Sequence, residues 1–299
     1  MRYLIYKSTN LLDSILLDNH EDCIYIRITD DDLKSRIFNR LILYARNHNL
    51  FIPFLLKLLH GFSKLRIITI DDIVIVFDIA DITLIEYIRK CIPKAHSFNV
   101  FFWNPMSKTF EEPQKAIQRL KKIGCIISTF DKKDSEIYHL IYKKQFIKKI
   151  STPNLPIKYD FYFLGTPKGR EATLQSITQR FKDIGKTGIC IVPHSKEQFI
   201  PYDRNLQYVL QSFCIIEVVQ EGQEGLTLRA LEALVYGKKL ITTLRNIVNY
   251  DFYNPNNILI WNNQTNDELT SFLNTNYIMI EQKIIDKYSL HNWIQSYSK

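Results

Sequence analysis

The sequence lacks the glycine-rich signatures of two large classes of nucleotide-binding enzymes. It contains no Gly-x-Gly-x-x-Gly fingerprint and no Walker lysine motif. The first motif holds a dinucleotide pyrophosphate and the second holds the phosphates of a nucleoside triphosphate. Their absence argues against a dehydrogenase and against an NTPase. Internal repeats and low-complexity tracts are also missing.

Cysteine is sparse and carries no pairing pattern. The five cysteines are odd in number and widely separated, and no Cys-x-x-Cys occurs: Cys23, Cys91, Cys125, Cys190 and Cys214. A structural zinc site or a disulfide framework is therefore not expected, and we predict reduced cysteines in a cytoplasmic protein. Long apolar runs are missing as well, because no stretch approaches the roughly 20 uncharged residues of a membrane span. The amino-terminal stretch becomes polar too soon for a signal peptide.

Length and charge set the remaining bounds. With 299 residues, of which 46% are hydrophobic, the chain can form two domains of about 150 residues. A net charge of +8 implies an acidic partner, for which nucleotide phosphates, anionic lipid and nucleic acid all qualify. Because no zinc, aromatic-platform or recognition-helix motif is present, we expect no nucleic-acid partner.

Strand-like and helix-like segments alternate along the chain, which predicts an α/β fold with parallel sheets. The expected strands in the first half are 3–6, 23–28, 65–70, 73–77, 98–103 and 125–130, with helices at 82–90 and 114–122. Two prolines within a polar stretch at 150–157 indicate a linker. We therefore expect one domain over 1–150 and a second over 151–280.

Residues 215–243 form the most informative stretch. An apolar strand, 215–219, is followed by a loop with Gly222 and Gly225, a helix that ends at Gly237, and another strand, 239–243. Helical spacing places Arg229 and Glu232 on one face. Because a helix N-terminus favours phosphate, one interpretation is that Arg229 binds a diphosphate and Glu232 accepts ribose hydroxyls. The alternative is an ordinary ion pair within the helix.

A similar strand, loop and helix unit opens the second domain. The expected strand 159–164 runs into Gly165, and then Lys168 and Arg170 precede a helix at 171–181. The two cations suit a diphosphate, although a capped helix with an exposed basic turn explains them too. The next strand, 188–192, ends beside His194, which we predict to contact the base of a nucleotide.

Several of these segments resemble GT-B glycosyltransferases. Glu224 and Glu232 resemble the glutamate pair of that class, and the string QEGLTLRALEALVYGKKLITTLRNIVNYDFYNPNNILIW is similar to bacterial glycosyltransferases of capsule and lipopolysaccharide biosynthesis. The resemblance implies a sugar-nucleotide loop followed by a glutamate, matched here by Gln223, Gly225, Thr227, Arg229 and Glu232. It also implies that Glu224 touches the donor sugar in retaining enzymes, and that a Gly…Lys-Gly segment, here 165–169, binds the donor phosphate.

The same resemblance implies two Rossmann-like domains that face a cleft, with the acceptor on the first and a last helix, 281–299, that packs back on it. Ligands of parallel sheets collect at the carboxyl ends of the strands. This rule points to Asn10, Asn104 and Asp131 on the acceptor side. Asp131 is a candidate catalytic base for an inverting reaction, whereas its spacing from Asp134 also fits a helix N-cap.

Metal and membrane contacts have weaker signals. Asp30–Asp32 and Asp71–Asp72 are the candidates for a divalent metal, but the first group fits helix capping and the second fits a turn, so we expect no metal requirement. The basic helix expected over 33–59 and the basic run 143–149 suit peripheral contact with an anionic membrane. A core helix and a solvated helix face are the alternatives.

Together these features predict a hexosyltransferase-like glycosyltransferase. It would transfer a sugar, without a metal or other cofactor, from a nucleotide sugar to a bacterial surface glycan such as capsule, O-antigen or lipooligosaccharide. The acceptor would be a glycan or a lipid-linked glycan. Asp131 as base favours inversion, whereas Glu224 as sugar ligand fits retention. The alternative is a catalytically silent GT-B-like subunit that binds nucleotide or scaffolds a partner transferase.

Overall fold

The computed structural model describes residues 1–17, 22–29, 64–92, 97–152, 155–220, 222 and 224–297. The helix expected over 33–59 and the aspartates at 30–32 lie outside these residues. The chain divides into two compact units, residues 1–143 with 294–299 and residues 144–293. Each unit holds one sheet whose described strands pair in parallel, so the predicted α/β class is confirmed.

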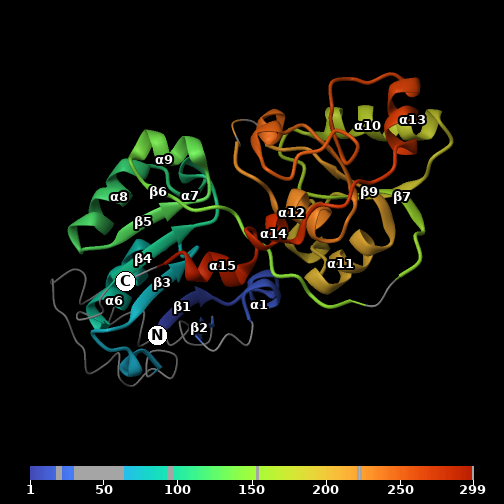
Figure 1. The fold of residues 1–299 in the computed structure, drawn as a ribbon. Helices are drawn as coiled ribbons and strands as arrows, with labels where there is room; N and C mark the ends of the chain where they lie inside the picture. The colour runs from blue at the N-terminus through green and yellow to red at the C-terminus, as the bar shows by residue number, and fades with distance from the viewer. Residues whose placement is uncertain are drawn as a thin grey trace. The chain divides into compact units, whose positions relative to one another are not determined.

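The first unit is built on a parallel sheet with the strand order β2-β1-β3-β4-β5-β6 (Figure 1). The described strands are β1 Arg2–Lys7, β2 Cys23–Ile28, β3 Ile73–Phe77, β4 Ser97–Phe102, β5 Ile126–Thr129 and β6 Ile141–Tyr142. The described helices are α1 Asn10–Leu16, α6 Ile82–Cys91, α7 Met106–Thr109, α8 Pro113–Lys122 and α9 Lys132–Tyr138, with a 3-10 helix η1 at Lys64–Ile67.

The central strand of this unit, β3, is apolar because both faces of the sheet are covered there. All five residues of β3 are buried, as expected for a central parallel strand. Helix α8 begins with Pro113 in its first turn and buries Ala116, Ile117 and Leu120. Three of its four basic residues lie in the last turn, where they complement the helix dipole. The alternation of strands and helices thus positions the carboxyl ends of β3, β4 and β5 at one edge.

The strand expected over 65–70 is wrong. Residues Lys64–Ile67 form η1, and the chain then turns at residues 70 and 71. Ile67 and Ile70 are 54% and 62% exposed, so their β-branched side chains have no covering layer there. Asp72 stabilises the turn instead, because its Oδ2 accepts hydrogen bonds from the Thr69 amide at 2.6 Å and from the Thr69 hydroxyl at 2.8 Å.

The second unit has the strand order β11-β10-β9-β7-β8. Its described strands are β7 Tyr159–Leu164, β8 Gly188–Ile191, β9 Ser212–Glu217, β10 Lys239–Thr242 and β11 Ile258–Ile260. Its described helices are α10 Glu171–Asp183, α11 Tyr202–Leu210, α12 Leu228–Val235, α13 Asn266–Asn274, α14 Gln282–Asp286 and α15 Leu290–Gln295, with 3-10 helices η2 Lys196–Gln198 and η3 Arg245–Asn249.

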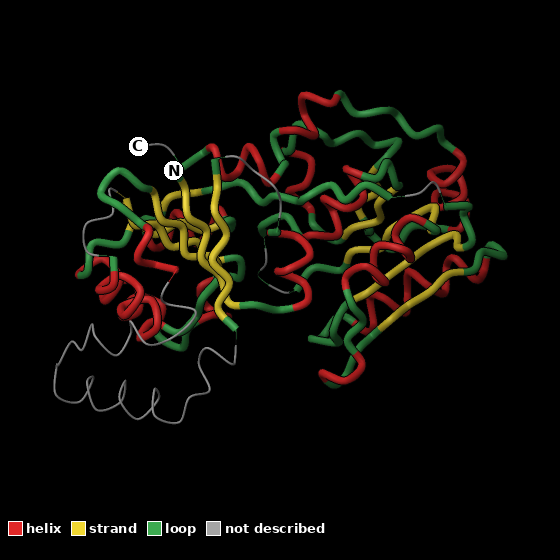
Figure 2. The backbone as a smooth tube through the Cα atoms, turned by 90° about the horizontal axis from the view of Figure 1, so that it is seen from below, coloured by secondary structure: helices red, strands yellow, loops and turns green. Residues whose placement is uncertain are grey.

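Helices cover both faces of this second sheet (Figure 1). Ile215 packs with α11 and α12 on one face, whereas its neighbours Cys214 and Ile216 pack with α10 and α13 on the other. This alternation follows the two-residue period of a strand. Figure 2 shows the strands of each unit side by side, with helices next to them.

Residues 281–299 were expected to form one terminal helix, but the described part of this stretch forms two short helices, α14 and α15. Residues 281–293 belong to the second unit, and residues 294–299 belong to the first. Within the first unit, Tyr297 is buried, its hydroxyl lies 3.2 Å from the Ser128 hydroxyl, and its carbonyl accepts from Arg2 Nε at 2.9 Å. The chain therefore passes between the units twice.

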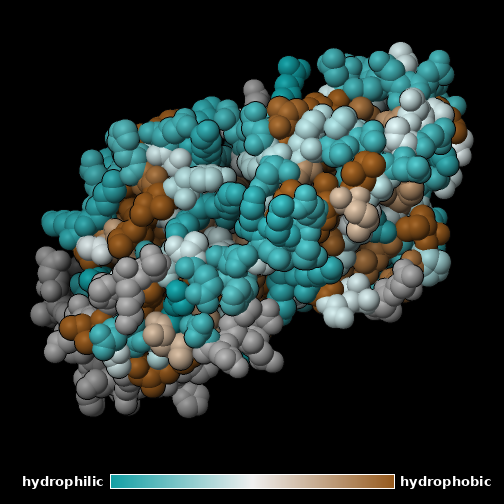
Figure 3. All heavy atoms as spheres, in the orientation of Figure 1, coloured by the Kyte–Doolittle hydropathy of each residue, from teal (hydrophilic) through white to brown (hydrophobic). Residues whose placement is uncertain are grey.

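The surface is mixed in character. On the face shown in Figure 3, hydrophobic atoms form separate patches among hydrophilic ones. In the part of the chain that the structure describes, no helix is both long and apolar enough to cross a bilayer.

Candidate functional site

The carboxyl edge of the second sheet brings the two predicted glycine-containing loops together. Strand β7 ends at Leu164 and strand β9 ends at Glu217, and these strands are direct neighbours in the sheet. The loop after β7 leads to α10, and the loop after β9 leads to α12. Residues that were predicted from separate stretches of sequence therefore share one edge.

The loop after β7 depends on glycine for close packing. The Gly165 amide donates to the Ile191 carbonyl at 3.1 Å, and a Cβ at this position would lie 2.9 Å from the Phe163 ring and 3.0 Å from Arg170 Nη2. Lys168 and Gly169 both have positive φ, at 47° and 78°. This turn leaves the Lys168 side chain exposed at the edge.

Arg170 binds the protein's own backbone. Its Nη1 donates to the Val218 carbonyl at 2.7 Å, just beyond the end of β9, and its Nε donates to the Thr166 carbonyl at 2.9 Å. Burial lowers the pKa of Arg170, and the nearby guanidinium of Arg229 lowers it further. Arg170 therefore connects the loop after β7 to the end of β9.

Arg229 makes the reciprocal connection. From the first turn of α12 it reaches the end of β7, where Nε and Nη2 donate to the Leu164 carbonyl at 3.2 and 3.1 Å. Its Nη1 donates to Glu232 Oε2 at 2.9 Å. Within the described residues these bonds use three of the five N–H groups of a guanidinium, so two remain to bind another group.

Glu232 lies inside the fold. Its side chain is 0% exposed, and its Oε1 accepts from Asn205 Nδ2 at 2.8 Å while Oε2 accepts from Arg229. The Asn205 carbonyl oxygen accepts in turn from the Tyr162 hydroxyl at 3.0 Å. The structure thus shows the ion pair with Arg229, and a direct contact of Glu232 with a nucleotide stays a prediction.

Glu217 is a part of the site that the sequence analysis missed. It is 2% exposed, and its two carboxylate oxygens accept from the hydroxyls of Thr227 and Thr242. Burial raises the pKa of this carboxyl. The sequence did hold a signal for this contact: Glu217 ends one apolar strand and Thr242 ends the next. Two parallel neighbouring strands place such residues side by side, and Thr242 does pair with Glu217.

Thr227 is the N-cap of α12, and its hydroxyl accepts from the Arg229 amide at 3.1 Å. Its O–H is directed at Glu217, so a bond to a nucleotide through that O–H requires the Glu217 contact to open. The predicted role of Thr227 as a hydroxyl donor to a ligand therefore competes with a structural role.

The loop between β9 and α12 is anchored at several points. The Val219 amide donates to Thr243 Oγ1 at 2.9 Å, and Asn246 Nδ2 donates to the Glu224 carbonyl at 2.9 Å. Gly225 is buried and the Glu224 side chain is exposed. Gln223 lies outside the described residues. Thr243 directly follows β10 and Asn246 lies in η3, and the sequence analysis assigned neither residue to the site.

His194 follows β8 at the same edge of the sheet. Its amide donates to Gln198 Oε1 at 2.7 Å, and its side chain is exposed. Since β8 pairs with β7 through Leu164 and Ile191, the His194 loop starts beside the Gly165 loop. Its predicted contact with a base stays a prediction.

In the first unit, the predicted acceptor-side residues also follow strands. Asn10 begins α1 after β1 and is exposed, and Asn104 follows β4. Asn104 Nδ2 donates to Asp78 Oδ2 at 3.1 Å, and Asp78, which directly follows β3, also accepts from the Trp103 amide at 2.9 Å. Burial raises the pKa of Asp78. Asp78, which the sequence analysis did not single out, thus orients the loop after β4.

Asp131 occupies the N-cap position of α9, one of the two interpretations of its spacing. Its Oδ1 accepts from the Asp134 amide at 3.1 Å, and the residue is 2% exposed. Among the described residues its Oδ2, which is buried, has no hydrogen-bond partner. Asp134 accepts from the Met106 amide at 2.7 Å, and burial followed by the charge of Asp131 raises its pKa. Abstraction of a proton by Asp131 stays a prediction, and it requires solvent access that this conformation lacks.

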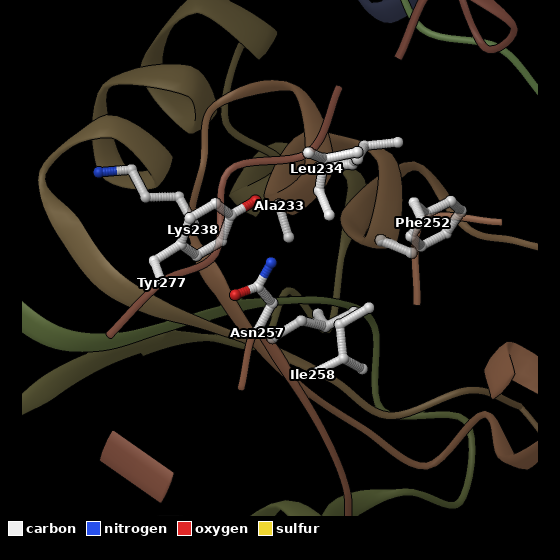
Figure 4. Close-up of a pocket in the computed structure, with 10 residues that line it drawn as sticks. Ala233, Leu234, Lys238, Phe252, Asn257, Ile258 and Tyr277 are labelled. Carbon is white, nitrogen blue, oxygen red and sulfur yellow. The ribbon is translucent and has the colours of Figure 1, made fainter. Parts of the chain in front are cut away.

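The second unit also contains a small cavity between α12 and β10, lined by Ala233, Lys238, Asn257 and Tyr277 among others (Figure 4). Its volume of about 10 Å³ is room for a single water molecule, far too little for a nucleotide. Figure 4 shows the Lys238 ammonium directed away from it, and burial lowers the pKa of this lysine to about 8.

Among the described residues, no group of three or more His, Cys, Asp and Glu side chains is placed to hold a metal ion.

Comparisons with solved structures identify the fold. TarM of S. aureus is 12% identical, with a TM-score of 0.53 over 77% of this chain and 55% of TarM. A trehalose-6-phosphate protein from E. coli, bound with UDP-2-fluoro glucose, is 12% identical with a TM-score of 0.49 over 98% and 97% of the chains. T4 phage BGT, in complex with its UDP-glucose substrate, is 11% identical with a TM-score of 0.43 over 99% and 98%.

No family model and no curated protein sequence matches the chain. Of the three structures, TarM alone exceeds a TM-score of 0.5, and the matched part spans about half of its length. At 12% identity this likeness concerns the fold and nothing finer. The parallel sheets, their helical layers and this likeness together show that the chain has the GT-B glycosyltransferase fold.

Proposed function

We propose that the protein is a glycosyltransferase that moves a sugar from a nucleotide-sugar donor to a bacterial surface glycan, such as capsule, O-antigen or lipooligosaccharide, without a metal ion. The observation that carries the donor half of this proposal is that Arg229 donates to the Leu164 carbonyl at the end of β7, directly before the turn that bears Lys168. The acceptor half rests on the sequence resemblance to polysaccharide-biosynthesis enzymes.

The charge at this edge suits a diphosphate. The Lys168 ammonium is exposed on a tight turn, and two N–H groups of Arg229 remain after its internal bonds. The N-terminus of the eight-residue helix α12 adds the partial positive charge of its dipole. These groups would stabilise the charge that develops on a leaving nucleoside diphosphate, as a metal does in other enzymes.

The reaction would exchange one bond for another at the anomeric carbon. The acceptor hydroxyl oxygen forms a bond to that carbon, the bond from the carbon to the diphosphate oxygen breaks, and the nucleoside diphosphate leaves with the electron pair. The hydroxyl proton passes to a base or to solvent. Glu224, exposed on the loop before α12, is the proposed contact to the donor sugar.

A thermal-shift panel with UDP, GDP, CMP, TDP and NAD, each with and without EDTA, tests the donor site. UDP is the first probe because a TarM variant has been crystallised with it. We expect one nucleotide to raise the melting temperature equally in both conditions, since a ligand at 100 times its Kd stabilises the folded state by about 2.7 kcal/mol. Loss of the shift in EDTA would exclude metal independence, and no shift with any nucleotide would contradict the donor site.

A catalytically silent subunit is the second candidate, and the burial of Asp131 favours it. In this conformation the predicted base is an N-cap at 2% exposure, so a hydroxyl cannot reach it. Such a subunit would bind the stabilising nucleotide without consuming its sugar conjugate. The discriminating measurement is release of nucleoside diphosphate from that conjugate, with and without a lipid-linked glycan extract, in wild type and in Asp131→Asn. Release in wild type would exclude the silent subunit.

A further inference from the structure

A buried chain of hydrogen bonds runs from the interior of the second unit to the proposed diphosphate site. It starts at the Tyr162 hydroxyl, passes through the Asn205 amide and the Glu232 carboxylate, and reaches the Arg229 guanidinium. Arg229 then donates to the Leu164 carbonyl, directly before the Gly165 loop. Asn205 is 2% exposed and Glu232 is 0% exposed. Arg229 is the more exposed partner of its ion pair with Glu232, at 19% against 0% of the side chain.

The burial of Glu232 conflicts with a direct contact to a ribose. Both of its oxygens already accept bonds from Asn205 and Arg229 inside the protein. If Glu232 turned toward a ligand, it would remove one hydrogen-bond acceptor from the buried Asn205 amide and one from the partly buried Arg229 guanidinium, which is costly. Its charge, 2.9 Å from Arg229, instead fixes the guanidinium and offsets the cost of its burial.

We propose that Glu232 and Asn205 are positioning residues that act through Arg229. Asn205 orients the Glu232 carboxylate, Glu232 holds the Arg229 guanidinium against the end of β7, and Arg229 presents its two remaining N–H groups to the donor diphosphate. Glu232 makes no contact with the ribose hydroxyls. This assignment rests on the proposed donor site and departs from the role that the glutamate pair implies by resemblance.

The ratio of the affinities for ribose and deoxyribose nucleotides distinguishes two possible roles of Glu232: positioning of Arg229 and direct contact with the ribose. The affinities of UDP and 2′-deoxy-UDP, and of GDP and its 2′-deoxy form, are measured for wild type and Glu232→Gln by calorimetry. We expect Glu232→Gln to weaken each ribo and deoxy pair by the same factor, about tenfold, so that the wild-type ratio is retained. Loss of that ratio in Glu232→Gln would establish a direct ribose contact and overturn the proposal.

A double-mutant cycle tests whether the effect passes through Arg229. Asn205→Ala is expected to weaken binding of the same nucleotide by about tenfold in the wild-type background. In an Arg229→Gln background, Asn205→Ala should change the affinity by less than about twofold, because the group it positions is gone. An undiminished tenfold loss in that background would overturn the assignment.

A matched control separates positioning from general loss of stability. Asn99, on β4 in the first unit, is also a buried asparagine, and its Nδ2 donates to the Val74 carbonyl at 3.2 Å and to the Ser97 hydroxyl at 2.7 Å. Asn99→Ala should lower the melting temperature about as much as Asn205→Ala, yet leave nucleotide affinity unchanged. Equal losses of affinity in both variants would mean that Asn205 acts only through stability.

A replacement variant and the wild-type binding measurement cover the cases in which Asn205→Ala does not fold or no nucleotide binds. If Asn205→Ala does not fold, Tyr162→Phe removes the first bond of the chain, keeps the ring, and should weaken binding in the same Arg229-dependent way. If the wild-type protein binds no nucleoside diphosphate, both the proposed function and this assignment fail. If the wild type binds and the variants behave as wild type, the assignment alone fails.

Discussion

At the scale of single residues, burial decides which charged side chains can meet a ligand. Lys168 and Lys239 have the same chemistry, but Lys168 is exposed on a turn whereas Lys239 is 2% exposed. The Lys239 ammonium donates to the Asn256 carbonyl at 2.9 Å, the Phe272 carbonyl at 2.6 Å and the Thr275 hydroxyl at 2.7 Å. All three hydrogens of the ammonium are thereby used inside the fold.

We expect Lys239→Met to lower the free energy of unfolding by about 1–3 kcal/mol, because it removes the three hydrogen bonds that the buried ammonium donates. Urea denaturation of the variant measures this loss. Lys168→Met serves as the control, since its exposed ammonium should contribute little to stability and should instead be required for nucleotide affinity. Wild-type stability in Lys239→Met would contradict the structural role of this ammonium.

At the scale of elements, the N-terminus of α12 is held between two strands by Glu217. The carboxylate lies at the end of β9 and accepts from Thr227, which caps α12, and from Thr242, which ends β10. Arg170 and Arg229 add crossed connections, each from the helix or loop of one strand to the carbonyl at the end of the other. These few polar groups therefore connect the N-terminus of α12 to the ends of β7, β9 and β10.

The buried Glu217 carboxyl predicts that the stability of the folded state decreases as the pH rises. Burial raises the pKa of Glu217 above its ordinary value of 4.5, so the folded state binds more protons than the unfolded state in the window above pH 4.5. The contribution of Glu217 to stability is then fully present below that pH and is lost as the pH rises through the folded pKa.

Urea midpoints of wild type and Glu217→Gln at pH 5 and pH 8 measure this linkage. Because the amide does not titrate, the stability of Glu217→Gln relative to wild type should be higher at pH 8 than at pH 5. A difference between the two proteins that is the same at both values would mean that Glu217 does not carry a raised pKa.

At the scale of the whole molecule, the chain passes between its two units twice, after residues 143 and 293. Residues 294–299 complete the first unit, where the Tyr297 ring is buried and lies 4.3 Å from the Lys143 ammonium. The last residues of the described chain therefore stabilise the unit that contains the first ones. The first unit is therefore discontinuous in sequence, whereas the second is one continuous stretch.

Tyr297→Ala should destabilise the first unit by about 3–5 kcal/mol, as large aromatic truncations in a core do. The second unit should keep its nucleotide-dependent stabilisation, because the proposed donor site lies within residues 144–293. Limited proteolysis with and without the stabilising nucleotide monitors the units separately. Earlier cleavage within the second unit, rather than the first, would contradict this division of roles.

The sequence by itself was sufficient for the fold class, for most strands of both sheets, and for the strand, loop and helix units around Gly165 and Arg229. These features depend on local periodicity and on glycine placement, which are written along the chain. The strand expected over 65–70 failed because β-branched residues favour a strand only where a neighbouring strand and a covering layer exist.

Only the tertiary structure decided the environment of each polar group. It joined Asn205 to Glu232 across 27 positions of sequence, directed Arg229 to a carbonyl 65 positions away, and buried Asp131 as an N-cap. Helical spacing correctly paired Arg229 with Glu232, but it could not say which side of the pair faces solvent. That depends on which elements pack above the helix, and such packing is set by contacts between distant parts of the chain, which have no periodicity to read.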